Sequence, residues 1–267
     1  MAAPCASARL SSTAGEVARF TVGESEGSSG PQMETTTREE LQMSTAAEVM
    51  AAVKARDTEK VKSLLEADPS LARTKTDDGS LLLTAVYYGA REAAKLIQAL
   101  RDDLDIGEAS TVGDVERVRA LVDADPSLVN ASGGDGWRPL HLAAYFGQTG
   151  VAELLLDRGA DASAFSLVEH PNIPRNTALH AALAGRAWDV ARLLISRGAG
   201  VDLADSHGLQ PLHLAASNGS VELTRILLER GVEVNPRDKK GVTPLGHAVQ
   251  RGHAEVADLL RQAGGVE

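Results

Sequence analysis

A short motif returns along this chain at a nearly constant interval, and this periodicity restricts the fold more than any other feature of the sequence. Its fullest copy runs from Trp137 to Gly147 and reads WRPLHLAAYFG, and altered copies begin at Thr177, Gln210 and Thr243. A motif that recurs at a fixed interval of this size indicates an array of similar units rather than one globular core.

Seven segments align on the leucine of this motif. The aligned residues, which we call the anchors, are Val49, Leu82, Ile106, Leu140, Leu179, Leu212 and Leu245, at spacings of 33, 24, 34, 39, 33 and 33 residues. Alanine stands three residues after every one of them, and leucine or isoleucine fifteen residues after. These two columns of the alignment, one of alanine and one of leucine or isoleucine, predict seven units. The units lie near residues 44–77, 78–102, 103–134, 135–173, 174–206, 207–239 and 240–267.

The fourth unit shows why each segment should fold as two helices. Gly136 allows a turn, and Pro139 suits the first turn of a helix, where its missing N–H leaves no hydrogen bond unmade. Apolar residues follow at helical spacing until Gly147, which can end the helix in a left-handed conformation. A second helix is expected over residues 149–157. Neither helix can cover its own apolar face, so the units must stack on one another.

The turn, the P-L-H-x-A helix start, the second helix and the G-A-D that follows it together resemble the ankyrin repeat, over about residues 44–267. The resemblance implies an all-α ankyrin-repeat solenoid of about seven helix-turn-helix units with short finger loops. In that family the Thr hydroxyl and the His ring of a T-P-L-H tetrapeptide hydrogen-bond locally and brace the turn. No unit here has all four residues, the departures being Arg138 and Gln210 for Thr, Ala178 for Pro and Gly246 for His. We therefore expect incomplete bracing in every unit.

Two spacings depart from the period. The 24-residue step leaves no room for a finger between Leu100 and Ile106, and the 39-residue step places extra residues within Ser166–Pro174. That insertion either enlarges a binding rim or is neutral loop variation. The sequence D-P-S-L occurs at both Asp68 and Asp125, which indicates an old duplication or a shared solution for a longer loop.

Residues 1–43 are rich in Ser, Thr, Gly, Glu and Ala and lack apolar periodicity, so we expect a disordered tail. Met33 and Met43 are alternative start sites to Met1. The net charge of −10 disfavours nucleic acid as a partner, because phosphate would repel the chain. No apolar run reaches the roughly 18–20 residues that cross a bilayer, which excludes a membrane span. The single cysteine, Cys5, fits a reducing compartment, and we expect a cytoplasmic protein that is monomeric alone.

Candidate catalytic and metal-binding residues have simpler interpretations. His141, His180 and His213 recur at one position per unit, roughly 10 Å apart by the usual spacing of packed helices, and are therefore too far apart to share an ion. We interpret them as structural residues of the helix starts. The glycines of 133–136 lack the spacing and the lysine of a phosphate-binding loop and are expected at a finger tip. We predict no catalytic residues, no metal site and no cofactor.

Aromatic residues carry the positive signal for binding. Tyr87 and Tyr88 occupy the same two positions of their repeat unit as Tyr145 and Phe146 do of theirs. Trp137 lies beside a finger. The resemblance implies that these slots face a concave groove, and such residue types are enriched at interfaces. The alternative is that some of them pack against a neighbouring unit. The remaining candidates for partner contact, from the same slots and from adjacent fingers, are His207, Leu209, Ser217, Asn218, Lys239, Lys240, Gln250 and Arg251.

The side chains that face this groove would change along the array from aromatic to polar and partly basic. This fits a partner with an apolar side chain to bury and an acidic end. We therefore predict a protein-protein interaction module or scaffold that binds a partner protein of unknown identity through its groove and fingers. One alternative is a regulatory or inhibitory subunit, of the antitoxin or immunity kind, that masks a partner enzyme or toxin. A more remote alternative is an enzyme.

Overall fold

A computed structural model describes residues 38–76, 79–134, 136–168 and 174–267 of the chain. Most of the predicted disordered tail, residues 1–37, lies outside the described part. The first helix, α1 (Arg38–Ala55), begins inside the segment predicted as tail rather than near Ser44. The physical reason is local, because residues 38–43 read REELQM and all six residues are of types that form helices readily.

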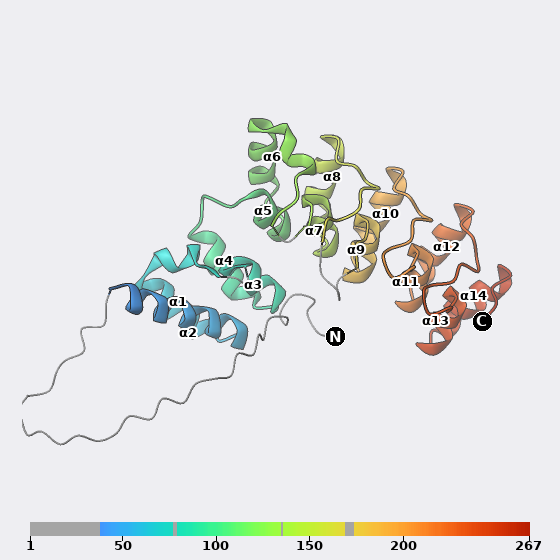
Figure 1. Cartoon of the computed structure of the whole chain (residues 1–267), viewed down its shortest axis with the longest axis horizontal. Coiled ribbons are helices and arrows are strands. Elements are labelled where there is room, and N and C mark those ends of the chain that lie inside the picture. Colours follow the sequence, from blue (N-terminus) through green and yellow to red (C-terminus); the bar gives the residue numbers. More distant parts are fainter. Residues whose placement is uncertain (1–37, 77–78, 135, 169–173) are drawn as a thin grey trace, which may run out of the picture. The chain divides into compact units, whose positions relative to one another are not determined.

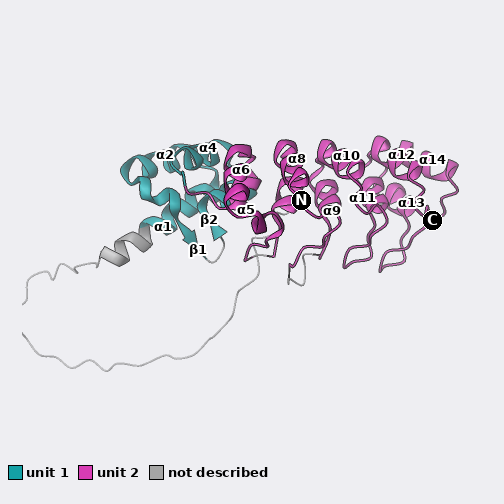
Figure 2. Cartoon of the chain, turned by 90° about the horizontal axis from the view of Figure 1, so that it is seen from above, with its two compact units in different colours: residues 1–102 teal, residues 103–267 magenta. Residues whose placement is uncertain are grey.

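The described residues form an all-α fold, as the motif predicted, with fourteen α-helices arranged as seven consecutive pairs. The chain divides into two compact units, residues 1–102 and 103–267, shown in separate colours in Figure 2. This boundary falls in the connection predicted to be too short for a finger, between α4 (Arg91–Ala99) and α5 (Ile106–Val112).

Unit 1 contains the helix pairs α1 with α2 (Thr58–Ala67) and α3 (Leu81–Tyr87) with α4. Its first helices, α1 and α3, pack on each other, as do its second helices, α2 and α4. A short antiparallel hairpin joins the two pairs, with β1 (Lys75–Thr76) opposite β2 (Gly79–Ser80).

Unit 2 contains five helix pairs, which follow one another along the chain in Figure 1. The pairs are α5 with α6 (Val115–Ala124), α7 (Pro139–Tyr145) with α8 (Thr149–Asp157), α9 (Ala178–Gly185) with α10 (Trp188–Ser196), α11 (Pro211–Ser217) with α12 (Val221–Glu229), and α13 (Pro244–Gln250) with α14 (Ala254–Gln262). Figure 2 shows the second helices of this unit side by side in one row, with the connecting loops extending beyond the first helices. We call each segment from a second helix to the next first helix a finger.

Local chemistry explains the boundaries of each pair. Pro139 is the first residue of α7, and Gly147 follows that helix with a φ of 73°, as predicted. The bounds of α8 also agree with the prediction. The alanine column lies in the core: Ala52 is 4% exposed, and the other six alanines are fully buried. Small residues at these positions let the helices approach closely.

Two helices of unit 2 approach each other closely at Gly185. A Cβ at this position would stand 2.0 Å from the carbonyl oxygen of Tyr145, at the end of α7. The last turn of α9 therefore packs directly on the backbone of α7, and only a residue without a side chain fits there.

The two D-P-S-L segments form the same local structure. Each begins a short 3-10 helix, η1 (Pro69–Arg73) in unit 1 and η2 (Pro126–Asn130) in unit 2. In both, the Asp carboxylate accepts hydrogen bonds from the Ser backbone N–H at 3.0 Å and the Ser hydroxyl at 2.6 Å. The repeated sequence is thus a repeated cap for the turn that follows a second helix.

Candidate functional site

The recurring histidines link each helix start to the finger that follows it. The Nε2 atoms lie within hydrogen-bond distance of backbone carbonyl oxygens, which can only accept, so each ring donates. The pairs are His141 with Asn176 at 3.0 Å, His180 with Leu209 at 2.9 Å, and His213 with Pro236 at 3.1 Å. This confirms the prediction that these histidines are structural.

Burial keeps these rings neutral. Loss of solvent lowers the pKa of His141 from 6.5 to about 4, against the opposing effect of its bond to Asn176. Burial also lowers the pKa of His180 and of His213. A neutral ring that already donates to a carbonyl is poorly placed to transfer protons to a substrate.

The prediction of incomplete bracing in every unit was wrong for the fifth helix pair. The hydroxyl of Thr177 lies 2.8 Å from Nδ1 of His180, so the local brace is intact although Ala178 replaces the proline. The expectation does hold for the fourth pair, where Arg138 replaces the threonine and Nδ1 of His141 has no hydrogen-bond partner among the described residues.

Two aspartates that the sequence reasoning did not select fix the finger turns. Oδ1 of Asp205 accepts from the backbone N–H groups of His207 and Leu209, at 2.8 and 2.9 Å. Oδ1 of Asp238 accepts in the same way from Lys240 and Val242, at 2.9 Å each. Their equal spacing from the anchor leucines, seven residues before Leu212 and Leu245, was the available signal.

Asp238 also meets His247, whose Nε2 lies 3.0 Å from Oδ2. Burial alone would raise the pKa of this carboxyl, but hydrogen bonds from the Val242 N–H and from His247 outweigh it, and the pKa is lowered. The charged carboxylate is thus held in place as the cap of the turn.

The finger tips carry exposed side chains beyond these caps. His207, Lys239 and Lys240 are exposed, and the N–H of Lys239 donates to the carbonyl of His207 at 3.0 Å, which brings the two tips together. Leu209 is half-buried, and its carbonyl is the acceptor for His180. The first three of these candidates therefore form one basic surface, which we call the fingertip surface.

The predicted aromatic residues of unit 2 lie at both ends of α7. The Trp137 ring lies 6.0 Å from the ring of His141 at the start of the helix. Tyr145 and Phe146 meet edge to face at the other end, with centroids 5.0 Å apart. All three are half-buried. Tyr87 and Tyr88 are half-buried at the end of α3, in unit 1.

The candidates at the ends of α11 and α13 differ in whether they already contact a neighbouring helix pair. The side-chain amide of Asn218 donates to the carbonyl of Leu183 at 2.9 Å, and the carbonyl of Ser217 lies 3.1 Å from Nε2 of His253. Both residues therefore also join neighbouring helix pairs. Gln250 and Arg251 are exposed at the end of α13.

The insertion is attached to the preceding finger. The N–H of Leu167 donates to the carbonyl of Gly136, and the N–H of Ser166 to the carbonyl of Asn176, both at 2.8 Å. Gly136 has a φ of 81°, and a Cβ there would stand 2.5 Å from the backbone of Leu167. Residues 169–173, which include His170, lie outside the described part.

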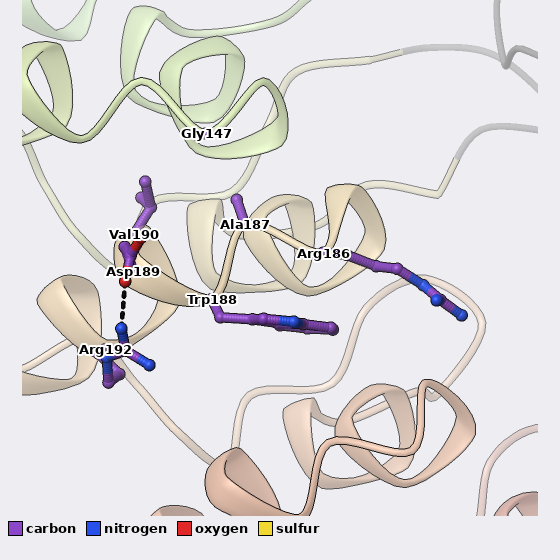
Figure 3. Close-up of a pocket in the computed structure, with 7 residues that line it drawn as sticks. All are labelled: Gly147, Arg186, Ala187, Trp188, Asp189, Val190 and Arg192. Carbon is purple, nitrogen blue, oxygen red and sulfur yellow. Dashed lines mark hydrogen bonds and ion pairs between the residues drawn. The ribbon is translucent and has the colours of Figure 1, made fainter.

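Sequence reasoning missed the residues around a shallow hollow at the turn between α9 and α10. Its volume is ≈ 220 Å³, and Figure 3 shows the side chains that line it. The lining residues are Gly147, Arg186, Ala187, Trp188, Asp189, Val190 and Arg192. The available signal was an arginine, Arg186, in a column where five of seven helix pairs have glycine.

Within the part of the chain that the structure describes, no three His, Cys, Asp or Glu side chains gather closely enough to hold a metal ion. The helices of the same part are all too short or too polar to cross a membrane.

Comparison with known proteins assigns the family. A family model described as ankyrin repeats, in three copies, matches residues 106–205 and 179–267. These matches together span more than half of the 267 residues. The chain therefore belongs to the ankyrin repeat family, whose members are generally protein-interaction modules and typically not enzymes.

Curated relatives cover a smaller part of the chain. It is similar to rat "Ankyrin repeat and SAM domain-containing protein 6", 33% identical over 104 residues, which are 39% of this chain and 11% of that protein. It is also similar to the rice "Probable E3 ubiquitin-protein ligase XBOS31", 35% identical over 106 residues, which are 39% of this chain and 22% of that protein. The similarity thus spans only a small share of each relative.

Proposed function

We propose that the chain binds a partner protein through the fingertip surface and the ends of the first helices of unit 2, and acts as an interaction module or scaffold. One observation carries this proposal: the residues that fix the fingers and the residues that the fingers expose are separate. Asp205 and Asp238 hold the turns, whereas His207, Lys239 and Lys240 are exposed at the tips. A rigid turn with exposed side chains loses little conformational entropy on binding.

The chemistry of this surface favours a partner segment with an acidic end and an apolar anchor. Lys239 and Lys240 supply positive charge in a chain whose net charge is −10, and Arg251 is exposed at the end of α13. Tyr145 and Phe146 offer half-buried aromatic rings at the end of α7. Aromatic residues of this kind often dominate the binding energy of an interface.

We further propose that the chain is not itself an enzyme and acts by stoichiometric binding as a monomer without a cofactor. In support, the rings of His141, His180 and His213 are neutral and donate to backbone carbonyls, which leaves them without the role of a proton-transfer group. A cytoplasmic location is proposed on the sequence ground that a single cysteine cannot form a disulfide within the chain.

Capture of partners from the native cell tests this proposal when variants are compared quantitatively. The variants Lys239→Glu, Lys240→Glu and the pair Tyr145→Ala with Phe146→Ala should each reduce recovery of the same partner. The matched control is Arg225→Glu on α12, an exposed arginine of a second helix. Equal recovery by all variants would contradict the proposed surface. A 1:1 complex in which the partner's activity changes would identify the inhibitory form of the function.

A further inference from the structure

The turn between α9 and α10 carries an arginine where backbone conformation favours glycine. Seven residues after each anchor, the backbone is left-handed in all seven described helix pairs. Five pairs have glycine there, and two have arginine: Arg56 with a φ of 59° and Arg186 with a φ of 57°. A side chain with a Cβ is disfavoured in this conformation. Each arginine therefore needs a compensating reason to occupy its turn.

Arg56 has a structural reason, and Arg186 does not. Nε of Arg56 donates to the carbonyl oxygen of Tyr88 at 2.6 Å and so ties two helix pairs of unit 1 together. The guanidinium of Arg186 is exposed and makes no hydrogen bond or ion pair with the described residues. Packing and internal hydrogen bonding thus leave this arginine unexplained.

An aromatic ring accompanies Arg186. Trp188 is half-buried at the start of α10, and Figure 3 shows its ring and the Arg186 side chain extending to the same side of the turn. The equivalent position in the other six helix pairs holds Thr, Arg, Val, Thr, Val and Ala. The combination of a cation and a large flat ring is therefore particular to this turn.

The other charged side chains that line the hollow have ion-pair partners. Asp189 forms an ion pair with Arg192, and Arg192 also pairs with both carboxylate oxygens of Glu222, at 2.9 Å each. Arg186 is therefore the charged side chain of the hollow that has no ion-pair partner among the described residues, and its positive charge remains available to an anion.

We propose that the turn between α9 and α10 is a second docking site, which binds an Asp or Glu side chain of a partner protein with an apolar residue beside it. The guanidinium of Arg186 matches a carboxylate in geometry and charge, and the ring of Trp188 covers the apolar residue. A single unpaired arginine suits a singly charged carboxylate, whereas phosphate groups are usually met by clusters of arginines. This site does not depend on the fingertip surface binding anything.

A library of random displayed peptides, selected on the full chain and counter-selected on the Arg186→Gly variant, tests the site. Selected peptides should carry Asp or Glu beside an apolar residue. Each is then synthesised with that acid and with the matching amide. We expect Arg186→Gly, and separately the change from acid to amide, to weaken binding by about tenfold. Trp188→Thr, which installs a residue type found at this position in other pairs, should weaken it by about fivefold.

Matched variants separate this site from the fingertip surface. Arg56→Gly makes the same substitution at the equivalent turn of unit 1 and should leave peptide affinity unchanged. Circular dichroism confirms folding of Arg186→Gly, which places glycine where the backbone favours it. The proposal is overturned if no selected peptide depends on Arg186, or if the amide peptides bind as tightly as the acids. Peptides that lose affinity on Lys240→Glu or Tyr145→Ala but not on Arg186→Gly would support the surface of the proposed function and count against this second site.

Discussion

Nε2 of His180 donates a hydrogen bond to the carbonyl oxygen of Leu209, 2.9 Å away and 29 residues further along the chain. Because Nε2 carries the proton, Nδ1 is an acceptor, and the Thr177 hydroxyl donates to it at 2.8 Å. The neutral ring therefore satisfies a partner on each side. A second proton on Nδ1 would turn that acceptor into a donor, so the backbone N–H of Thr177, 3.4 Å away, would lose its acceptor and the hydroxyl would have to accept instead of donate.

The first prediction concerns stability against pH, which should fall on mild acidification because of His141. Burial lowers the pKa of this ring from 6.5 to about 4. The unfolded chain takes up the proton near pH 6.5 and the folded chain only near pH 4. Stability is therefore full above pH 6.5 and declines as the pH falls toward 4. We expect a loss of about 2 kcal/mol between pH 7 and pH 5 from this ring.

Urea denaturation of His141→Gln at several pH values measures this effect. The glutamine amide can still donate to the carbonyl of Asn176 but does not titrate, so the dependence on pH should become shallower. His207→Gln, at an exposed fingertip residue, serves as the control and should keep the slope of the parent chain. A slope unchanged in His141→Gln would show that this ring does not drive the loss.

The second prediction concerns the brace between Thr177 and His180. Thr177→Val keeps the shape of the side chain but removes the hydroxyl, so the buried Nδ1 keeps only the longer hydrogen bond, 3.4 Å, from the Thr177 backbone N–H. We expect a loss of about 1 kcal/mol in the free energy of unfolding. The control is Thr149→Val at the start of α8, where the hydroxyl makes no hydrogen bond with the described residues, and this change should be nearly neutral. Equal losses in the two variants would contradict the brace.

Much of the fold was predictable because it depends on local chemistry. Pro139 and Gly147 mark the ends of α7, and the alanine column marks the buried contacts, so a pattern read within one unit extends to the others. The bonds from histidine to the next finger were not predictable in this way. They join atoms about one period apart, and a residue type alone does not reveal which carbonyl lies opposite.

The candidate site was predictable only as a set of equivalent positions in the repeat, without the contacts that each side chain makes. The resemblance placed Asn218 and Arg251 in equivalent positions, but the structure commits the Asn218 amide to the carbonyl of Leu183 and leaves Arg251 exposed. Arg186 was not predicted because its position is not among those that the resemblance implies for partner contact. Its signal was a break in the glycine column, which becomes informative once the left-handed backbone is known.

The third prediction concerns the contact of α9 with α7. Gly185→Ala would place a Cβ 2.0 Å from the carbonyl oxygen of Tyr145, and backbone atoms cannot move aside as a flexible side chain can. We expect a loss of about 2–3 kcal/mol, together with exposure of the apolar contact between the two helices. Gly134→Ala is the control, since a Cβ there meets nothing within 4 Å. Denaturation midpoints followed by tryptophan fluorescence report on this contact, because both tryptophans, Trp137 and Trp188, lie in unit 2.

The fourth prediction contrasts the two arginines in left-handed turns. Arg186→Gly relieves the backbone without removing any internal hydrogen bond, so it should stabilise unit 2 by about 1 kcal/mol. Arg56→Gly relieves the same conformation but removes the bond to the carbonyl of Tyr88, worth about 1 kcal/mol, so its net effect should be near zero. Tryptophan fluorescence follows the first variant and circular dichroism the second, because unit 1 contains no tryptophan. A loss of stability in Arg186→Gly would mean that this side chain supports the fold, whereas a gain would leave binding as the reason for its presence.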